Sequence, residues 1–122
     1  RYNMMRHDDQ TRLRHMLDHA RETVQLASDR SRGDLDSDRL FSLAMTRLLE
    51  IVGEASARMS EATRDHHPTI PWHQIVGFRN RLIHGYDQVD MDILWDIIQI
   101  DLPPLIVELE KILGQENAAD SG

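Results

Sequence analysis

Several polar side chains that could act together on a phosphate group are concentrated in one short segment of this chain. The segment reads FRNRLIHGY over residues 78–86. An arginine offers a fixed fork of donors that matches phosphate oxygens, and a histidine exchanges a proton near neutral pH. This combination is suited to the cleavage of a phosphodiester. The candidate residues are Arg79, Asn80, Arg81, His84 and Tyr86.

The spacing of Arg79 and His84 does not place them on one face of a regular helix. Residues five apart point about 140° away from each other, whereas Asn80 and His84, four apart, share a face. We expect Gly85 to end the helix just beyond them. The length of the arginine side chain, or a residue from a second subunit, would have to close the gap.

The same residues also have a purely structural interpretation. Arginines near a helix end commonly lie on a solvated face, and a histidine in the last turn interacts favourably with the helix dipole without any catalytic role. Tyr86, after a glycine, is typical of a half-buried ring with a solvated hydroxyl. Spacing alone favours this structural interpretation.

Length and composition limit the class of protein. The 122 residues suffice for one domain, and the 40% hydrophobic content is too high for a disordered chain. No apolar run approaches the roughly 20 residues of a membrane helix, and no apolar segment near the start reads as a secretory signal. The lack of cysteine excludes disulfides, thiolate metal sites and cysteine nucleophiles. We therefore expect a single cytoplasmic domain over residues 1–122.

The formal net charge of -7 arises in the second half of the chain. Residues 1–64 hold 11 arginines and 11 acidic residues, whereas residues 65–122 hold three basic residues against ten acidic ones. Nucleic-acid binding draws most of its affinity from Lys and Arg, so the overall charge argues against it. Two of those three basic residues are Arg79 and Arg81, however, which focuses positive charge on the candidate site. The charge distribution therefore predicts that any nucleic-acid binding is weak and salt-sensitive, and that the acidic surface is a docking face for a basic partner.

Apolar residues at three-and-four spacing predict two amphipathic helices in the first half of the chain. The first stripe covers residues 13–27, residues 31–34 interrupt it, and the second stripe covers residues 41–59. Gly53 lies beside the second stripe, where close helix packing is its expected use. Competing N-caps for this second helix are Asp34, Asp36 and Ser37.

A loop bracketed by prolines and a third helix are predicted next. The loop covers residues 63–71, and Pro71 suits the first turn of a helix that ends at Gly85. The segment 85–89 is expected to be a turn. Since no strand pattern competes with these helices, we predict an all-α fold, an antiparallel bundle of four to five helices.

A fourth helix with a broad apolar surface covers residues 93–113. Pro103 and Pro104 must kink or break it near Asp101, and residues 115–122 are expected to form a frayed polar tail. The apolar surface exceeds what one bundle seam requires, which predicts a dimer interface. Its candidate N-caps are Asp90 and Asp92.

The segment from Arg79 to Tyr86 resembles the Arg-x-x-x-x-His-x-Tyr signature of HEPN-domain proteins of the HepT type, the toxin half of bacterial toxin–antitoxin pairs. The surroundings are similar to this family in identity, order and spacing over about residues 12–113. Pro104 and the seven histidines are not features that we can ascribe to the family. The matching residues outside the signature are Val52-Gly53-Glu54-Ala55, Pro68, Ile70-Pro71-Trp72, Ile75, Gly77, Val89-Asp90, Trp95 and Leu102-Pro103.

The resemblance implies a helical bundle that dimerises through the motif region, so that two copies of Arg79 and His84 line one cleft. It also implies a metal-independent ribonuclease in which the ribose 2′-hydroxyl attacks the adjacent phosphorus, giving a cyclic phosphate and a free 5′-hydroxyl. His84 would be the general acid or base, and Arg79 would hold the phosphate. Asn80 would orient the histidine or the phosphate. Glu54 either orients Arg79 from the neighbouring helix or is an ordinary surface acid.

The resemblance further implies a regulatory role for Tyr86. In HepT-type pairs the antitoxin is a minimal nucleotidyltransferase that attaches AMP to this tyrosine. The added phosphates would bring negative charge beside Arg79 and Arg81, occupy the site and repel RNA. Modification would therefore silence the nuclease.

Two alternatives stay open at the level of sequence. A non-catalytic HEPN module that binds the nucleotidyltransferase or a nucleotide would use Arg79 only as a phosphate anchor, and the acidic charge supports it.

His66, His67 and His73 could suggest a metal, but no patterned carboxylate or cysteine partner accompanies them, so we expect loop histidines and no metal. No glycine-rich phosphate loop is present, and we expect no cofactor.

Overall fold

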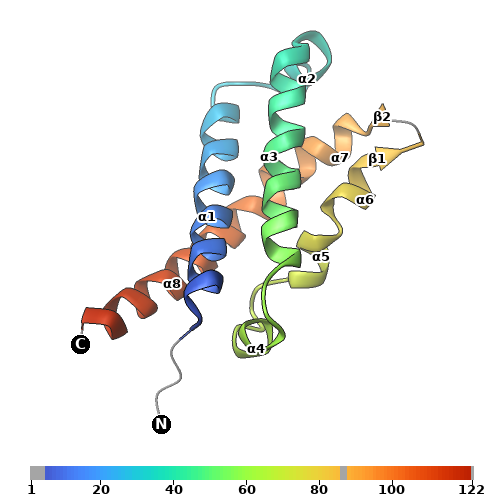
Figure 1. The fold of residues 1–122 in the computed structure, drawn as a ribbon. Coiled ribbons are helices and arrows are strands. Elements are labelled where there is room, and N and C mark those ends of the chain that lie inside the picture. Colours follow the sequence, from blue (N-terminus) through green and yellow to red (C-terminus); the bar gives the residue numbers. More distant parts are fainter. Residues whose placement is uncertain (1–4, 86–87, 122) are drawn as a thin grey trace.

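The computed structural model of this protein describes residues 5–85 and 88–121, with side chains as far as residue 115. The fold is all-α, as the sequence predicts, with one short hairpin in the described part of the chain. Two long helices, α1 and α3, run antiparallel side by side, and α8 packs across α1 (Figure 1). The elements in chain order are α1 (His7–Ala27), α2 (Asp34–Ser37), α3 (Arg39–Ala57), α4 (Glu61–His66), α5 (Trp72–Val76), α6 (Phe78–Leu82), β1 (Ile83–His84), β2 (Gln88–Val89), α7 (Met91–Asp96), the π-helix η1 (Ile97–Asp101) and α8 (Leu102–Ser121).

The apolar stripes of α1 and α3 are buried, as their spacing predicts, but α3 begins later than expected. Its N-cap is Asp38, whose carboxylate accepts a hydrogen bond from the Phe41 N–H. Asp38 has the extended backbone that an N-cap requires, whereas the four residues before it are already helical. The expected caps Asp34, Asp36 and Ser37 lie inside the separate short helix α2.

Gly53 of α3 has the packing role that the sequence predicts. A Cβ at this position would lie 3.1 Å from the backbone oxygen of Ile75 in α5. Only a glycine lets the two backbones approach so closely without a local shift. The α3–α5 contact therefore fixes where the chain enters the candidate site.

The segment predicted as a proline-bracketed loop is partly helical. Ser60 accepts a hydrogen bond from the Thr63 N–H and so begins helix α4, which continues to His66. The buried Asp9 of α1 accepts hydrogen bonds from the hydroxyls of Ser60 and Thr63. These bonds tie the start of α4 to the start of α1, and such a long-range contact leaves no periodic signal in the local sequence.

The third predicted helix is divided into three pieces. Gly77 separates α5 from α6, and the chain leaves the helix after Leu82 to form β1, which pairs antiparallel with β2. His84 lies opposite Gln88 in this hairpin and is not in the last turn of a helix. Gly85 adopts a left-handed backbone with φ of 72°, as suits a glycine at the start of a turn. Arg79 in α6 and His84 in β1 are therefore not related by the 140° rotation of a regular helix.

The two prolines do not end the last helix. The chain passes from α7 through the π-helical segment η1 into α8, with Pro103 and Pro104 in the first turn of α8. A π-helical turn accommodates the loss of two N–H donors without a break. The helix continues over residues 115–121, where we expected a frayed tail.

Among the described residues, no helix is both long and apolar enough to cross a membrane.

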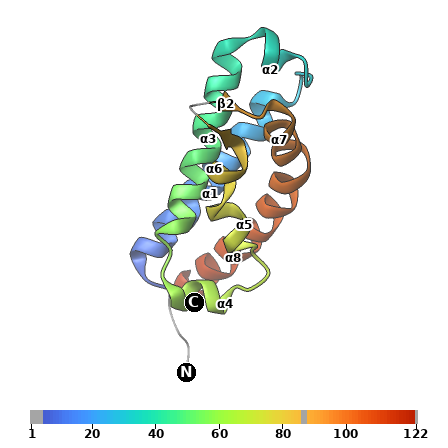
Figure 2. The same ribbon diagram turned by 90° about the vertical axis from the view of Figure 1, so that its right-hand side faces the viewer.

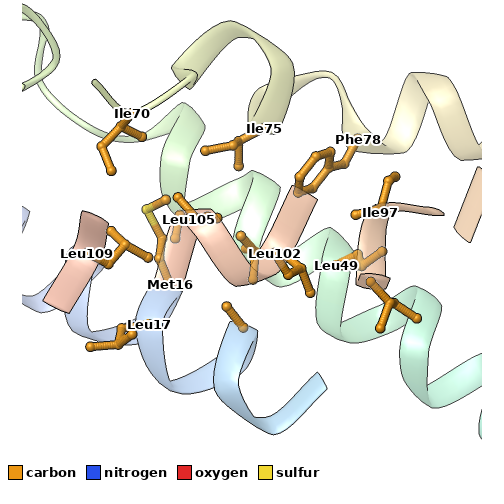
Figure 3. Close-up of a cluster of buried hydrophobic side chains, with 14 of the residues drawn as sticks. Met16, Leu17, Leu49, Ile70, Ile75, Phe78, Ile97, Leu102, Leu105 and Leu109 are labelled. Atoms are coloured by element: carbon orange, nitrogen blue, oxygen red, sulfur yellow. The ribbon is translucent and has the colours of Figure 1, made fainter. Parts of the chain in front are cut away.

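One hydrophobic core joins these elements (Figure 3). Phe78 and Ile75 reach into it from α6 and α5, and Ile97 and Leu102 enter it from η1 and α8. Figure 2 shows α5 and α6 between α3 and the α7–α8 ribbon. The core thus holds the segment that carries the candidate residues against both neighbours.

Candidate active site

Helix α6 presents its polar side chains outward because its apolar ones are anchored. Phe78 and Leu82, one turn apart, are almost fully buried. Arg79 and Asn80 are exposed, and the Arg79 side chain has 71% of its surface accessible. Two buried residues therefore flank the polar residues of α6 and hold them at a solvent-accessible edge of the core.

Arg79 contacts an acid of α3, and this acid is Glu50 and not Glu54. Its Nε lies 3.7 Å from Oε2 of Glu50, whereas Glu54 Oε1 lies 3.3 Å from Nη1 of Arg47. Of the two sequence interpretations of Glu54, its geometry matches the surface acid. Glu50 precedes Glu54 by one helical turn, and this spacing was the signal that could have marked it as a candidate.

His84 faces a carboxylate from the start of α7. Its Nε2 lies 3.6 Å from Oδ2 of Asp90, and 60% of the His84 side chain is accessible. The Asp90 N–H donates to the Leu82 carbonyl oxygen at 2.8 Å, which closes the hairpin at its base. The sequence pattern marks Asp90 as a helix cap and gives no sign of its contact with the histidine.

Arg81 is engaged differently from Arg79. Its Nη1 donates to Oδ2 of Asp101 at 2.8 Å, which links α6 to the π-helical segment η1. Arg81 is also less exposed than Arg79. We therefore assign it a structural part in the site and leave Arg79 as the arginine best placed to receive a phosphate.

Two remaining candidates are placed less completely. Asn80 is exposed on the segment that also carries Arg79 and His84. Tyr86 lies outside the described residues, so its predicted role stays a prediction.

The described residues contain no group of three or more histidine, aspartate or glutamate side chains that could hold a metal ion. The rings of His66 and His67 contact each other edge to face, with centroids 4.9 Å apart.

This arrangement combines a phosphate-binding group with a proton-transfer group. Arg79 and His84 are both exposed, and each lies near a carboxylate from a different element. A guanidinium stabilises charge that develops on phosphate oxygens, and an imidazole moves a proton to or from a neighbouring oxygen. The geometry suits phosphodiester chemistry on a substrate large enough to lie across an open surface.

Comparison with known proteins decides the family. The family model described as "Ribonuclease HepT-like" matches residues 16–112, a span that contains the whole FRNRLIHGY segment. The chain belongs to the HepT-like ribonuclease family. No solved structure matches it. The resemblance inferred from the sequence is therefore confirmed at the level of the family.

Three relatives align with most of this chain. "Putative RNase MJ1380" of Methanocaldococcus jannaschii is 33% identical over 109 residues, which cover 89% of this chain and 100% of the relative. "Probable ribonuclease HepT" of Thermococcus cleftensis is 34% identical over 100 residues, covering 79% and 91%. "Putative RNase TTE0752" of Caldanaerobacter subterraneus is 33% identical over 104 residues, covering 85% and 93%. These three relatives are matched over nearly their full length.

Proposed function

We propose that this protein is a metal-independent endoribonuclease and the toxin of a toxin–antitoxin pair. Arg79 binds the scissile phosphate and stabilises the charge on its oxygens, and His84 is the general acid or base. Asn80 orients the phosphate or the imidazole. The observation that carries the proposal is that Arg79 and His84 are both exposed, with side-chain nitrogens 3.7 and 3.6 Å from carboxylate oxygens of other elements.

The reaction needs only the substrate and these side chains. The ribose 2′-oxygen forms a bond to phosphorus while the bond to the 5′-oxygen of the next nucleotide breaks. The 2′-hydroxyl loses its proton, and the leaving 5′-oxygen gains one. The products are a 2′,3′-cyclic phosphate and a 5′-hydroxyl. In a dimer whose two motif segments line one cleft, the second copy of His84 is available for the opposite proton transfer.

An exposed apolar surface beside the motif supports dimerisation through this region. Ile100 and Val107 lie one heptad apart on η1 and α8, and Ile100 keeps 63% of its surface accessible. Ile100 also lines a groove of about 240 Å³, together with Phe78 and Asp101. Exposed apolar side chains next to a polar rim are typical of interaction surfaces.

Tyr86 is the proposed acceptor of AMP from a minimal nucleotidyltransferase. Its oxygen would form a bond to the α-phosphorus of ATP while pyrophosphate leaves. Tyr86 follows His84 by two residues, so a phosphate there would compete for the charge that Arg79 offers to RNA. Intact-mass measurement after co-expression with the candidate antitoxin tests this. We expect a gain of one or more AMP units that persists in Tyr2→Phe and is lost in Tyr86→Phe.

Cleavage assays test the nuclease proposal. Purified wild type, Arg79→Ala, His84→Ala and the control His73→Ala are incubated with RNA in EDTA, and product ends are identified by mass spectrometry. We expect cyclic-phosphate ends from wild type and His73→Ala, with at least about a 100-fold loss in His84→Ala. Equal cleavage by all four proteins, or none by clean wild type, would contradict the proposal.

A non-catalytic binding module is the second candidate, favoured by the acidic charge. The described residues from 65 onward carry only Arg79, Arg81 and Lys111 as basic side chains, and Arg81 is engaged by Asp101. Expression without any partner separates the two functions. Growth arrest that disappears in His84→Ala favours the nuclease, whereas harmless expression of both proteins favours the module.

A further inference from the structure

The two carboxylate oxygens of Asp90 serve two different elements. Oδ1 accepts hydrogen bonds from the N–H groups of Asp92 and Ile93 at 3.0 and 3.1 Å, and so caps α7. Oδ2 lies 3.6 Å from Nε2 of His84. A single side chain therefore joins the start of a helix to the exposed histidine of the hairpin.

We propose that Asp90 is a positioning residue that holds the His84 imidazole through Nε2, so that Nδ1 is the nitrogen that exchanges a proton with RNA. This inference rests on the proposed ribonuclease function and names a further residue in it. A carboxylate that faces one ring nitrogen favours the tautomer with hydrogen on that nitrogen. The other nitrogen is then left free as the acceptor in the first proton transfer.

The Asp90 carboxylate is fixed before any substrate binds. Its own N–H donates to the Leu82 carbonyl oxygen, and its Oδ1 is held by two backbone amides, so little rotation remains at the side chain. The start of α7 is itself held, because Leu94 is fully buried. A group that is already oriented loses little freedom when it acts.

His84 has few other restraints. It lies in a strand of two residues and is largely exposed, so its backbone pairing with Gln88 fixes the position of the chain but not the ring. The 3.6 Å separation exceeds a hydrogen bond and corresponds to an electrostatic contact. Such contacts commonly shorten when substrate binds, and a small rotation of the exposed ring is sufficient here.

Two substitutions separate the capping role from the positioning role. Asp90→Asn and Asp90→Ser both keep an oxygen that can cap α7, but neither presents a negative charge to His84. Asp92→Asn is the matched control. It also removes one negative charge at the start of α7, but Asp92 contacts Arg32 and not His84. We expect the two Asp90 variants to lower kcat on a short RNA by at least about tenfold with KM within about twofold. Asp92→Asn should keep the wild-type kcat.

A second measurement reads the ring directly. In ¹⁵N-labelled protein, the signals of His84 are assigned by their loss in His84→Gln, and their chemical shifts report which nitrogen carries the proton. We expect the Nε2-protonated form to dominate in wild type and in Asp92→Asn, and this preference to be lost in Asp90→Asn. A structural cap alone would not move these signals.

The outcomes distinguish this inference from the proposed function. If wild type cleaves RNA and His84→Ala does not, but Asp90→Asn and Asp90→Ser keep the wild-type kcat, only the role of Asp90 is overturned. If wild type does not cleave RNA, the nuclease proposal fails, and the ring signals still decide whether Asp90 positions His84. Unchanged His84 signals in the folded Asp90 variants would overturn the inference.

Discussion

Arg79 of α6 contacts Glu50 of α3, and Glu54 one turn further along is turned to Arg47 instead. The contact with Glu50 uses the Nε of Arg79, which leaves its terminal nitrogens for a phosphate. Glu50 is much less exposed than Arg79, so α3 supplies the fixed partner and α6 the mobile one. Helix α3, which contributes to the core, thereby also contacts the Arg79 guanidinium at the candidate site.

Replacing Glu50 should therefore affect activity more than stability. We expect Glu50→Gln to lower kcat/KM for RNA by about threefold to tenfold, because the guanidinium loses the charge that orients it. The free energy of unfolding should change by less than about 1 kcal/mol, since Arg79 is mostly exposed. Cleavage kinetics and urea denaturation measure the two effects.

Glu54→Gln provides the control for this prediction. It removes one acid from the same helix but breaks only the exposed contact with Arg47. Its kcat/KM should stay within about twofold of wild type. A larger loss in Glu54→Gln than in Glu50→Gln would return Glu54 to the orienting role.

The apolar surface at Ile100 should decide the oligomeric state. A charge at this position would be buried in a dimer that forms through the motif region, at a large desolvation cost. We expect Ile100→Glu to convert a dimer to a monomer in sedimentation experiments and to reduce RNA cleavage with it. Leu40→Glu is the control, because Leu40 is 79% exposed at the start of α3, in another element. A dimer that survives Ile100→Glu but dissociates in Leu40→Glu would place the interface elsewhere.

Local sequence patterns identified most of the fold. The apolar stripes that place Met16 and Leu49 in the core, and the close approach at Gly53, follow from helical periodicity and from glycine's missing side chain. The hairpin at His84 was missed because two-residue strands carry no alternating pattern. The helix α4 was missed because its start depends on Asp9, which lies 51 residues before Ser60.

The candidate site was predictable in its residue types but not in its partners. Arg79 and His84 follow from the chemistry of their side chains, since few other groups bind a phosphate and move a proton. Glu50 and Asp90 became visible only when tertiary packing brought α3 and α7 beside the motif. Sequence spacing within one helix cannot report a contact between two elements.

Asp9 should make stability depend on pH in the acidic range. Burial raises the pKa of Asp9, but hydrogen bonds from Ser60, Thr63 and Arg12 outweigh burial, and the pKa lies below its ordinary value. A lowered pKa in the folded state stabilises the fold above the unfolded value of about 4. This contribution is lost as the pH falls through the lower, folded-state value.

The variant Asp9→Asn tests this pH dependence. We expect a loss of about 2 kcal/mol in the free energy of unfolding at neutral pH, because the hydroxyls of Ser60 and Thr63 lose a charged acceptor. The difference from wild type should shrink as the pH falls below about 4. Urea denaturation at a series of pH values measures it. Asp8→Asn, at the exposed neighbouring position, should leave stability within about 0.5 kcal/mol of wild type throughout.

Two glycine-to-alanine substitutions should have opposite effects. Alanine has the higher helix propensity by about 1 kcal/mol, so an unobstructed site gains stability. At Gly114 of α8 nothing lies within 4 Å of a new Cβ, and we expect Gly114→Ala to raise the unfolding free energy by up to about 1 kcal/mol. At Gly53 the new Cβ would lie 3.1 Å from the Ile75 backbone oxygen. A backbone atom cannot move away as easily as a flexible side chain.

We therefore expect Gly53→Ala to lower the unfolding free energy by about 1–3 kcal/mol in spite of its helix propensity. It should also lower RNA cleavage, because α5 leads directly into α6 and a shift of α5 moves Arg79 away from Glu50. Cleavage measured well below the unfolding midpoint separates this displacement from unfolding. A Gly53→Ala protein that is more stable than wild type, as Gly114→Ala should be, would show that the α3–α5 contact is looser than 3.1 Å implies.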